Sequence, residues 1–413
     1  MLRESLAMGA AFGFLVFFPK GKLWNGASLL IAGLIMGLGA GQSPRGVAEN
    51  FTGIVTSPPT MKTIAVILQI GVLSALMKQY DILGRLVEAF EDVFSSTKAV
   101  IMILPAAIGM VSVPGGAAIS SPFVDELGDS LRLPVFKRAA LNLTFRHCAF
   151  FLLPTSSSMI VFSNMAPHVS LYKLIALNVA FVAGMEFASY LLYLRGAEAP
   201  AAPRSGGGHT LRGLVSILKY MSPIYVIVLL NGLFKVPMYL SAFASLMLIL
   251  AGWGRSDAKA YARAFWQGLS GQTFVTMLGI YFMQNTVRDL TGIMAAFQTM
   301  FAQSSGFGVL LVIAAAALLF GLATGLSYVP LGVLVPLLTS LHLPPTEELL
   351  YCVFIYTWSF NGYFFSPLHL CQALTLQQMN CSVSALDKGY LPLMIEMAVA
   401  PFVIFGLYRT ILL

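Results

Sequence analysis

Charged residues are scarce in this 413-residue sequence: they make up 10% of the chain, against 58% hydrophobic residues. A soluble domain carries about 25% charged residues, so the composition excludes an ordinary water-soluble protein. The net charge is +7, but the basic residues are scattered between apolar runs. This scatter is typical of membrane topology and argues against a nucleic-acid partner. The lipid bilayer is therefore the first partner that the sequence predicts.

Cysteine and the common catalytic motifs are scarce as well. The four cysteines, Cys148, Cys352, Cys371 and Cys381, lack any CxxC or Cys/His metal spacing, so we interpret them as packing residues. No HExxH or GxSxG motif is present, and the few acidic residues are not clustered as a general acid and base would be. The sequence therefore predicts no enzyme and no cofactor, and an intramembrane enzyme is the least favoured alternative.

Long hydrophobic runs are abundant, and they occur in two copies about 210 residues apart. Residues 63–95 and 273–305 each lead from an apolar span through a charged collar into an amphipathic stretch. The similarity continues through proline-broken segments, in which Pro154 corresponds to Pro367. A duplicated membrane unit with paired helix breaks is typical of secondary transporters.

The repeat defines the domain organisation: a first repeat at 1–194, a polar linker rich in proline and glycine at 195–213, and a second repeat at 214–413. Each repeat contains spans, an amphipathic helix, a re-entrant hairpin and a broken helix. In the first repeat we expect spans at 5–19, 24–41, 62–79 and 170–194, the amphipathic helix at 82–95, the hairpin at 98–128 and the broken helix at 136–165. In the second we expect spans at 214–234, 236–252, 272–286 and 388–411, the amphipathic helix at 290–303, the hairpin at 307–341 and the broken helix at 346–379.

The number of crossings predicts how the two repeats are oriented. Each repeat crosses the membrane five times, since a hairpin enters and leaves on one side, and an odd number inverts the second repeat. With the linker in the cytoplasm, sixteen Lys and Arg residues fall on that side and seven on the other, as the positive-inside rule requires. The predicted fold class is thus an all-α polytopic membrane protein made of two inverted five-crossing repeats.

Helix breaks inside a membrane free backbone groups that can bind ions or substrate. Hydroxyls follow the first break, and we expect them to face the first hairpin tip, with Ser120 and Ser121 beyond it. The alternative is that small polar residues only allow helices to pack closely. The candidate substrate-binding residues at the tips and breaks are Ser112, Pro114, Gly115, Gly116, Thr155, Ser156, Ser157, Ser158, Ser327, Pro330, Ser359, Asn361, Ser366 and His369. No resident metal is expected, but a coupling sodium ion can be placed at Thr155, Ser156, Asn361 and Gly362.

Ionisable residues within the spans are the other candidates. Arg146 either balances an anionic substrate or pairs with an acid such as Glu186. Glu186 and Glu396 occupy equivalent spans and either carry protons or belong to the scaffold. His369 follows a break and can titrate near neutrality.

The order of these elements resembles the ion transporter superfamily, which includes the divalent anion/sodium symporters. The stretch VPGGAAISSPFVD at 113–125 resembles an uncharacterised permease family within that group. The tips read SVPGG at 112–116 and SYVPLG at 327–332, where sodium/dicarboxylate symporters carry Ser-Asn-Thr.

The resemblance implies a secondary active transporter of a small organic anion, coupled to sodium or protons. It also implies an elevator-type homodimer in the cell inner (plasma) membrane. Hairpins and broken helices would form the moving transport domain, and the other spans the scaffold and dimer contact. An anion channel or an exporter with the same fold remains the alternative.

The inverted topology leads to a first prediction. Single cysteines placed at Ser205, in the linker, and at Ser304, after the second amphipathic helix, should react with a membrane-impermeant thiol reagent from opposite sides. The same substitutions in a variant without the four native cysteines control for background labelling. Labelling of both positions from one side would contradict the inverted repeat.

Overall fold

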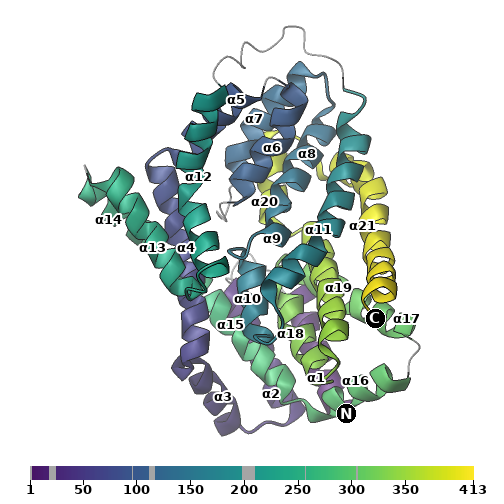
Figure 1. Ribbon diagram of the computed structural model, residues 1–413. Helices are drawn as coiled ribbons and strands as arrows, with labels where there is room; N and C mark the ends of the chain where they lie inside the picture. Colours follow the sequence, from purple (N-terminus) through teal and green to yellow (C-terminus); the bar gives the residue numbers. More distant parts are fainter. Residues whose placement is uncertain are drawn as a thin grey trace.

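The structure is a computed structural model that describes residues 2–17, 25–94, 96–110, 117–197, 210–255, 257–303 and 306–413. Within these ranges every regular element is a helix, and Figure 1 shows them as a bundle in which many helices run roughly parallel to a common axis. The N- and C-terminal ends lie in the same half of the molecule (Figure 1). The predicted all-α class is confirmed.

The helices of the second half follow the order of those in the first. The first half contains α1 (Leu2–Phe17), α2 (Asn25–Ala40), α3 (Pro44–Thr56), α4 (Pro58–Gln79), α5 (Ile82–Val93), α6 (Thr97–Met110), α7 (Ala117–Ser130), α8 (Val135–His147), α9 (Ala149–Leu152), α10 (Ser157–Met165) and α11 (Leu171–Ser189), which continues as a π-helical turn to Leu194. The second half contains α12 (Thr210–Gly232), α13 (Met238–Ile249, continued as a π-helical turn to Gly254), α14 (Ala258–Gly268), α15 (Gly271–Arg288), α16 (Thr291–Gln303), α17 (Gly306–Thr324), α18 (Tyr328–Thr339), α19 (Pro345–Phe364), α20 (Leu370–Gln378) and α21 (Val383–Leu412).

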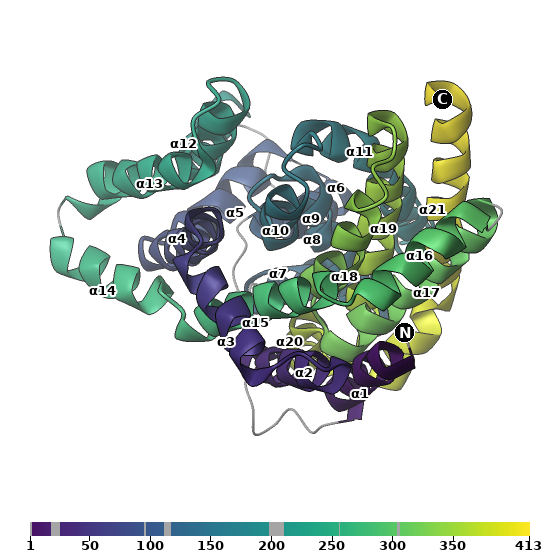
Figure 2. The same cartoon turned by 90° about the horizontal axis from the view of Figure 1, so that it is seen from below.

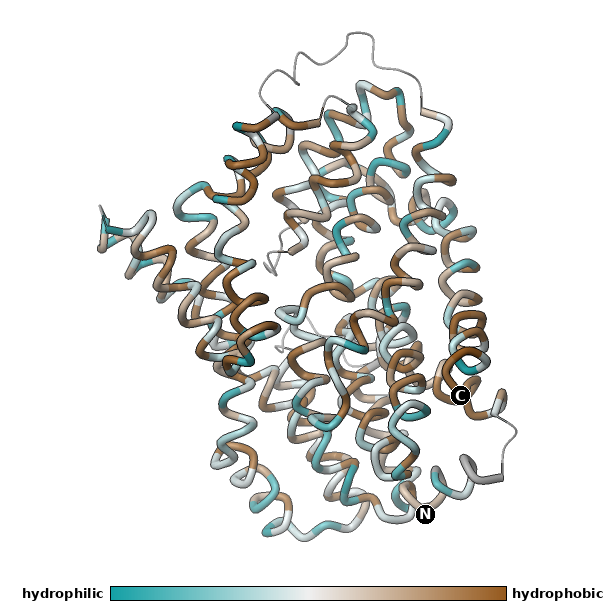
Figure 3. Tube along the Cα trace, viewed as in Figure 1, coloured by the Kyte–Doolittle hydropathy of each residue, from teal (hydrophilic) through white to brown (hydrophobic). Residues whose placement is uncertain are grey.

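Six helices of the described residues are long and apolar enough to cross a membrane. They are Pro58–Gln79, Val135–Met165, Leu171–Leu194, Leu211–Gly232, Gly306–Thr324 and Val383–Leu412. Figure 3 shows apolar residues along much of α21, and polar residues at the outer end of α14. The chain therefore has the construction of a multi-pass membrane protein.

The expected spans, hairpins and broken helices all correspond to helices. Two further helices, α3 and α14, occupy residues 44–56 and 258–268, for which the sequence predicts no element. Both are short, and proline opens α3 directly after its Ser43 N-cap. The amphipathic prediction for 82–95 is confirmed by α5, in which Ile82 and Leu86 are buried while Arg85 is exposed.

Several helices pack against a helix of the other half, and these pairs occur in matching sets with the two halves swapped. Helix α2 packs against α15, while α13 packs against α4; likewise α10 packs against α18, while α20 packs against α7. Figure 2 shows α4, α12, α13 and α14 gathered on one side of the hairpins and broken helices. The two hairpins, α6–α7 and α17–α18, lie at opposite ends of the molecule (Figure 1), as an inverted arrangement requires. The inversion itself stays a prediction.

Close backbone contact holds the second hairpin against the second broken helix. A Cβ atom added to Gly321 of α17 would lie 2.6 Å from the backbone of Gly362 in α19. At the hairpin tip, Gly325 has a φ of +64°, and an added Cβ would lie 2.8 Å from Leu368, in the break after α19. Small residues bring membrane helices together because lipid supplies little hydrophobic drive, so packing must hold the hairpin.

This crossing gives the second prediction. Replacing Gly321 by alanine should destabilise the protein by about 1–3 kcal/mol, the usual cost of overpacking a tight contact. Gly406 of α21 has no atom near its Cβ position, so Gly406→Ala should be neutral or slightly stabilising. Thermal unfolding of both purified variants in detergent measures the difference. Equal midpoints for the two variants would show that α17 and α19 are not in close contact.

Candidate functional site

The first helix break lies where the sequence predicted it. The chain leaves helical geometry at Leu153, where φ is −108° and ψ is 128°, and Ser156 caps the N-terminus of α10. The carbonyl of Phe150, freed by the break, accepts hydrogen bonds from the Ser156 hydroxyl at 3.1 Å and from the Tyr356 hydroxyl of α19 at 2.6 Å. A side chain from the other half of the protein thus satisfies a backbone group that lipid could not.

The hydroxyls after this break differ in their partners. Ser158 contacts Ser327, at the tip of the second hairpin, with 2.7 Å between the two oxygens. Ser158 therefore contacts the hairpin of the other half, as α10 packs against α18. The expectation that these hydroxyls face the first hairpin tip stays a prediction, because that tip lies outside the described residues. Thr155 is buried, and its hydroxyl has no hydrogen-bond partner within the described part of the chain. Ser157 is half-buried.

The first hairpin tip, with Ser112, Pro114, Gly115 and Gly116, lies outside the described residues. Beyond it, Ser120 and Ser121 are buried on α7, which packs against α8 and α20. These two serines therefore adjoin the broken helices of both halves, although they do not bond the hydroxyls after the first break in any contact that the structure describes.

The second break lies around Pro367, between α19 and α20, but three of the residues assigned to it lie before it. Helix α19 continues to Phe364, so Ser359, Asn361 and Gly362 lie within its last turns and not in the break. The amide nitrogen of Asn361 donates to the carbonyl of Met397 on α21 at 2.6 Å. Asn361 thus contacts α21, and Gly362 contacts α17, whereas Thr155 and Ser156 belong to the first break. The proposed sodium ligands are spread over these different contacts.

Ser366 lies in the second break and bonds both to the backbone of the break and to the second hairpin. The hydroxyl of Ser366 donates to the carbonyl of Leu322 in α17 at 2.7 Å and accepts from the amide of Leu368 at 3.1 Å. Pro330 is buried in the first turn of α18. The second hairpin is therefore bonded to both breaks, through Ser327 at one and Ser366 at the other.

A histidine pair joins the two broken helices. The Nε2 atoms of His147, the last residue of α8, and His369, the N-cap of α20, lie 3.1 Å apart. Each ring also has its Nδ1 against a backbone carbonyl, Leu143 for His147 at 2.5 Å and Phe364 for His369 at 3.1 Å. The sequence analysis identified His369 but gave His147 no role. The two are 222 residues apart, so no local pattern predicted their contact.

Arg146 is buried beside this pair. It retains 4% of its accessible surface, and its backbone carbonyl packs against Gly109, one residue before the end of α6. Its Nη1 atom has no hydrogen-bond partner in the part of the chain that the structure describes. The expected alternative, an ion pair with Glu186, is not formed, because both carboxylate oxygens of Glu186 are also without partners there.

The two intramembrane glutamates lie on neighbouring helices, since α11 and α21 are in contact. The Glu396 carboxylate lies against Gly184 of α11, and its Oε2 atom has no partner among the described residues. Glu186 lines a largely apolar cavity of about 510 Å³ between α6, α11 and α12. Carboxylates without fixed partners inside a membrane-protein core are candidates for proton carriers.

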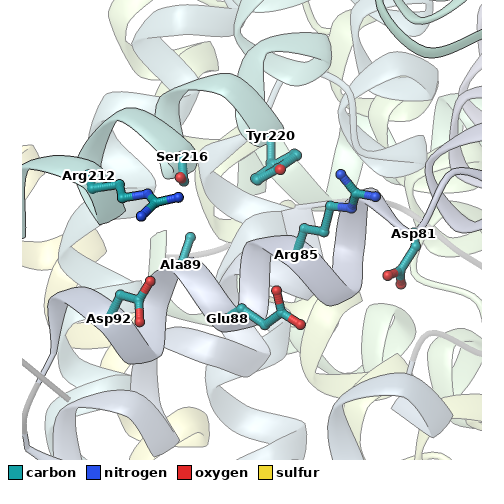
Figure 4. Close-up of a pocket in the computed structure, with 8 residues that line it drawn as sticks. All are labelled: Asp81, Arg85, Glu88, Ala89, Asp92, Arg212, Ser216 and Tyr220. Carbon is teal, nitrogen blue, oxygen red and sulfur yellow. The ribbon is translucent and has the colours of Figure 1, made fainter. Parts of the chain in front are cut away.

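A further groove of about 500 Å³ lies between α5 and α12, away from the breaks. Figure 4 shows acidic side chains of α5 below the basic Arg212 of α12, with Arg85 beside Tyr220. A hydrogen bond with Tyr220 raises the pKa of Arg85. Both signs of charge line the groove, so it does not select an anion. The amphipathic helix α5 forms one wall of the groove and packs closely against Gly213 of α12.

Comparison with known proteins shows a similar fold in a solved structure and a match to a sequence family. The fold is similar to that of the Alcanivorax borkumensis YdaH transporter, known from a crystal structure, with a TM-score of 0.61, 13% sequence identity and 90% of each chain covered. At this identity the likeness shows a shared fold. A family model described as "Protein of unknown function (DUF401)" matches residues 27–407, so the chain belongs to that family. No curated protein matches the sequence.

The contact between Ser158 and Ser327 gives the third prediction. Replacing either serine by alanine removes the bond to the other buried hydroxyl, which should cost about 1–3 kcal/mol. The double variant should lose less than the sum, by about 0.5–1.5 kcal/mol. Ser163→Ala on the same α10 is the control, because that hydroxyl bonds only within its own helix. Additive losses in equilibrium unfolding would contradict a direct contact between break and hairpin.

Proposed function

We propose that this protein is a secondary active transporter of a small organic anion. The observation that carries the proposal is the buried Arg146 beside two helix breaks, with a guanidinium nitrogen that the described residues leave unbonded. An arginine in a membrane span costs about 2.5–3.5 kcal/mol on insertion scales, and such residues mark substrate paths. A carboxylate is the ligand that matches the planar guanidinium in geometry and charge.

The surroundings of Arg146 support an anion site. The N-terminus of α10 begins at the first break, and a helix N-terminus presents a partial positive charge and free amides to an anion. The hydroxyls of Thr155 and Ser359 are buried near the two breaks without partners among the described residues, so they are available as donors. The shared fold with a solved transporter agrees with this proposal.

For the coupling ion we propose either protons or sodium. Glu186 and Glu396 carry carboxylate oxygens without partners in the described chain and are the candidate proton carriers. In the proposed sodium site the Asn361 amide nitrogen donates to Met397, while its Oδ1, the atom that would bind sodium, has no partner among the described residues. In an elevator mechanism the hairpins and broken helices would move together, since Ser327 and Ser366 bond them to one another. We place the protein as a homodimer in the cell inner (plasma) membrane.

Ligand binding followed by transport tests the function. Purified protein is screened by thermal shift against mono-, di- and tricarboxylates, with and without sodium and at several pH values. Any stabilising anion is then assayed in proteoliposomes for saturable uptake and counterflow. Counterflow identifies a carrier, whereas flux without it indicates an anion channel, and the direction of the driving gradient separates import from export. Absence of binding and of flux for every anion class would overturn the proposal.

The fourth prediction concerns Arg146 itself. Arg146→Lys keeps the charge but loses the two-pronged geometry, and should weaken anion binding by about 10–100-fold, as a charged hydrogen bond contributes about 1.5–3 kcal/mol. Arg146→Gln should nearly abolish binding. Arg45→Lys, at an exposed arginine paired with Glu49, is the matched control and should bind normally.

Isothermal titration with the anion found in the screen measures these affinities, and thermal unfolding without ligand measures stability separately. If both Arg146 variants bind the anion normally and lose only stability, Arg146 belongs to the scaffold.

A further inference from the structure

The strongest unassigned feature of the molecule is a cluster of three metal-ligating side chains between the two broken helices. Nitrogen atoms of His147 and His369 and the sulfur of Cys371 all lie within 4.8 Å of one another. Both histidines are buried, while Cys371 is only partly buried. His147 ends α8 of the first half, and the other two residues begin α20 of the second.

Hydrogen counting shows that this cluster is incomplete as two neutral histidines. The pair makes three contacts that each need a hydrogen: Nδ1 of His147 to Leu143, Nδ1 of His369 to Phe364, and Nε2 to Nε2 between the rings. Backbone carbonyls only accept hydrogen bonds, and two neutral imidazoles supply only two N–H groups. If both Nδ1 atoms donate to the carbonyls, two Nε2 lone pairs face each other at 3.1 Å. The hydroxyl of Tyr363, 3.2 Å from Nε2 of His147, can donate to that nitrogen, but it does not supply a hydrogen between the two rings. A cation between them resolves this conflict.

We propose that the cation is a transition-metal ion of the zinc class, bound by Nε2 of His147, Nε2 of His369 and the thiolate of Cys371. Zinc bonds to nitrogen are about 2.0–2.1 Å, so two nitrogens on a tetrahedral zinc lie about 3.3 Å apart, close to the 3.1 Å between these atoms. The backbone bonds at both Nδ1 atoms are the outer contacts that orient metal-binding histidines in proteins. Thiolate and imidazole together select zinc or copper over calcium and magnesium.

A zinc ion with its thiolate adds the same net charge as a shared proton, one positive charge, so the ligand set and its geometry carry the choice of a metal. Arg146 is a charged side chain that acts on both rings, and its positive charge opposes either cation. Binding Zn²⁺ displaces the proton of the Cys371 thiol, so the thiolate offsets part of the metal charge. The hydroxyl of Tyr363 lies 3.2 Å from Nε2 of His147, beside the proposed ligands.

The site would bridge the two halves, because its ligands come from both broken helices. This inference does not depend on the transport function: it concerns binding of the metal alone, and it can hold whether or not an anion is carried.

Cobalt(II) titration of the purified full-length protein in detergent tests the proposal. One equivalent of Co²⁺ should give the absorption of a tetrahedral site with a thiolate-to-metal charge-transfer band, and Zn²⁺ should displace it. Cys371→Ser should remove the charge-transfer band and lower the metal affinity by at least about 100-fold, as loss of an outer contact alone costs about 10–100-fold. Cys381→Ser changes another partly buried cysteine, outside the cluster, and should leave the spectrum unchanged.

A second measurement does not depend on any cysteine variant. Zn²⁺ should raise the unfolding temperature of the unaltered protein and of His342→Gln, whose histidine is exposed, but not that of His369→Gln. No cobalt spectrum and no zinc stabilisation of the unaltered protein would overturn the proposal. A charge-transfer band that survives Cys371→Ser would also overturn it. Stability that follows pH without any metal effect would assign the cation to a shared proton instead.

Discussion

The structure depends on one requirement, that backbone groups freed by a broken helix find partners inside the protein. Phe150 and Phe364 lie just before the two breaks, and their carbonyls accept bonds from side chains. Lipid offers no such donors, so an unsatisfied group at this depth would cost several kcal/mol. At the first break the partners come from both halves, Ser156 from its own half and Tyr356 from the other, so assembly of the two halves helps to satisfy the freed carbonyl.

Some of the polar residues in this core have a definite structural role. Serine and tyrosine hydroxyls complete the backbone at the breaks, and glycines allow the hairpin to approach α19. Arg146 has no such role, since neither Glu186 nor another acid compensates its charge in the described chain. Retaining an uncompensated charge lowers stability, so function is the simplest reason for keeping it.

The sequence predicted the order of elements well, since apolar spans and prolines act through local physics. Pro154 and Pro367 predicted the positions of both breaks. Helix α19 nevertheless includes Ser359 and Asn361, because helical hydrogen bonds remain possible until just before Pro367. Helices α3 and α14 were missed, because short polar helices lack the apolar run that marks a span. Contacts across more than 200 residues, such as His147 with His369, form because helices of one half pack against helices of the other. No periodic pattern in the sequence predicts such contacts.

The exchanged packing has a consequence for biosynthesis. The ribosome completes α7 and α10 long before α18 and α20, the helices that later cover them, have been made. During that interval Ser158 and the histidine of α8 have no partner across the repeat, and the nascent first half must wait in the bilayer with polar groups exposed or covered by the insertion machinery. Cooperative assembly of the core can therefore begin only after most of the chain has left the ribosome.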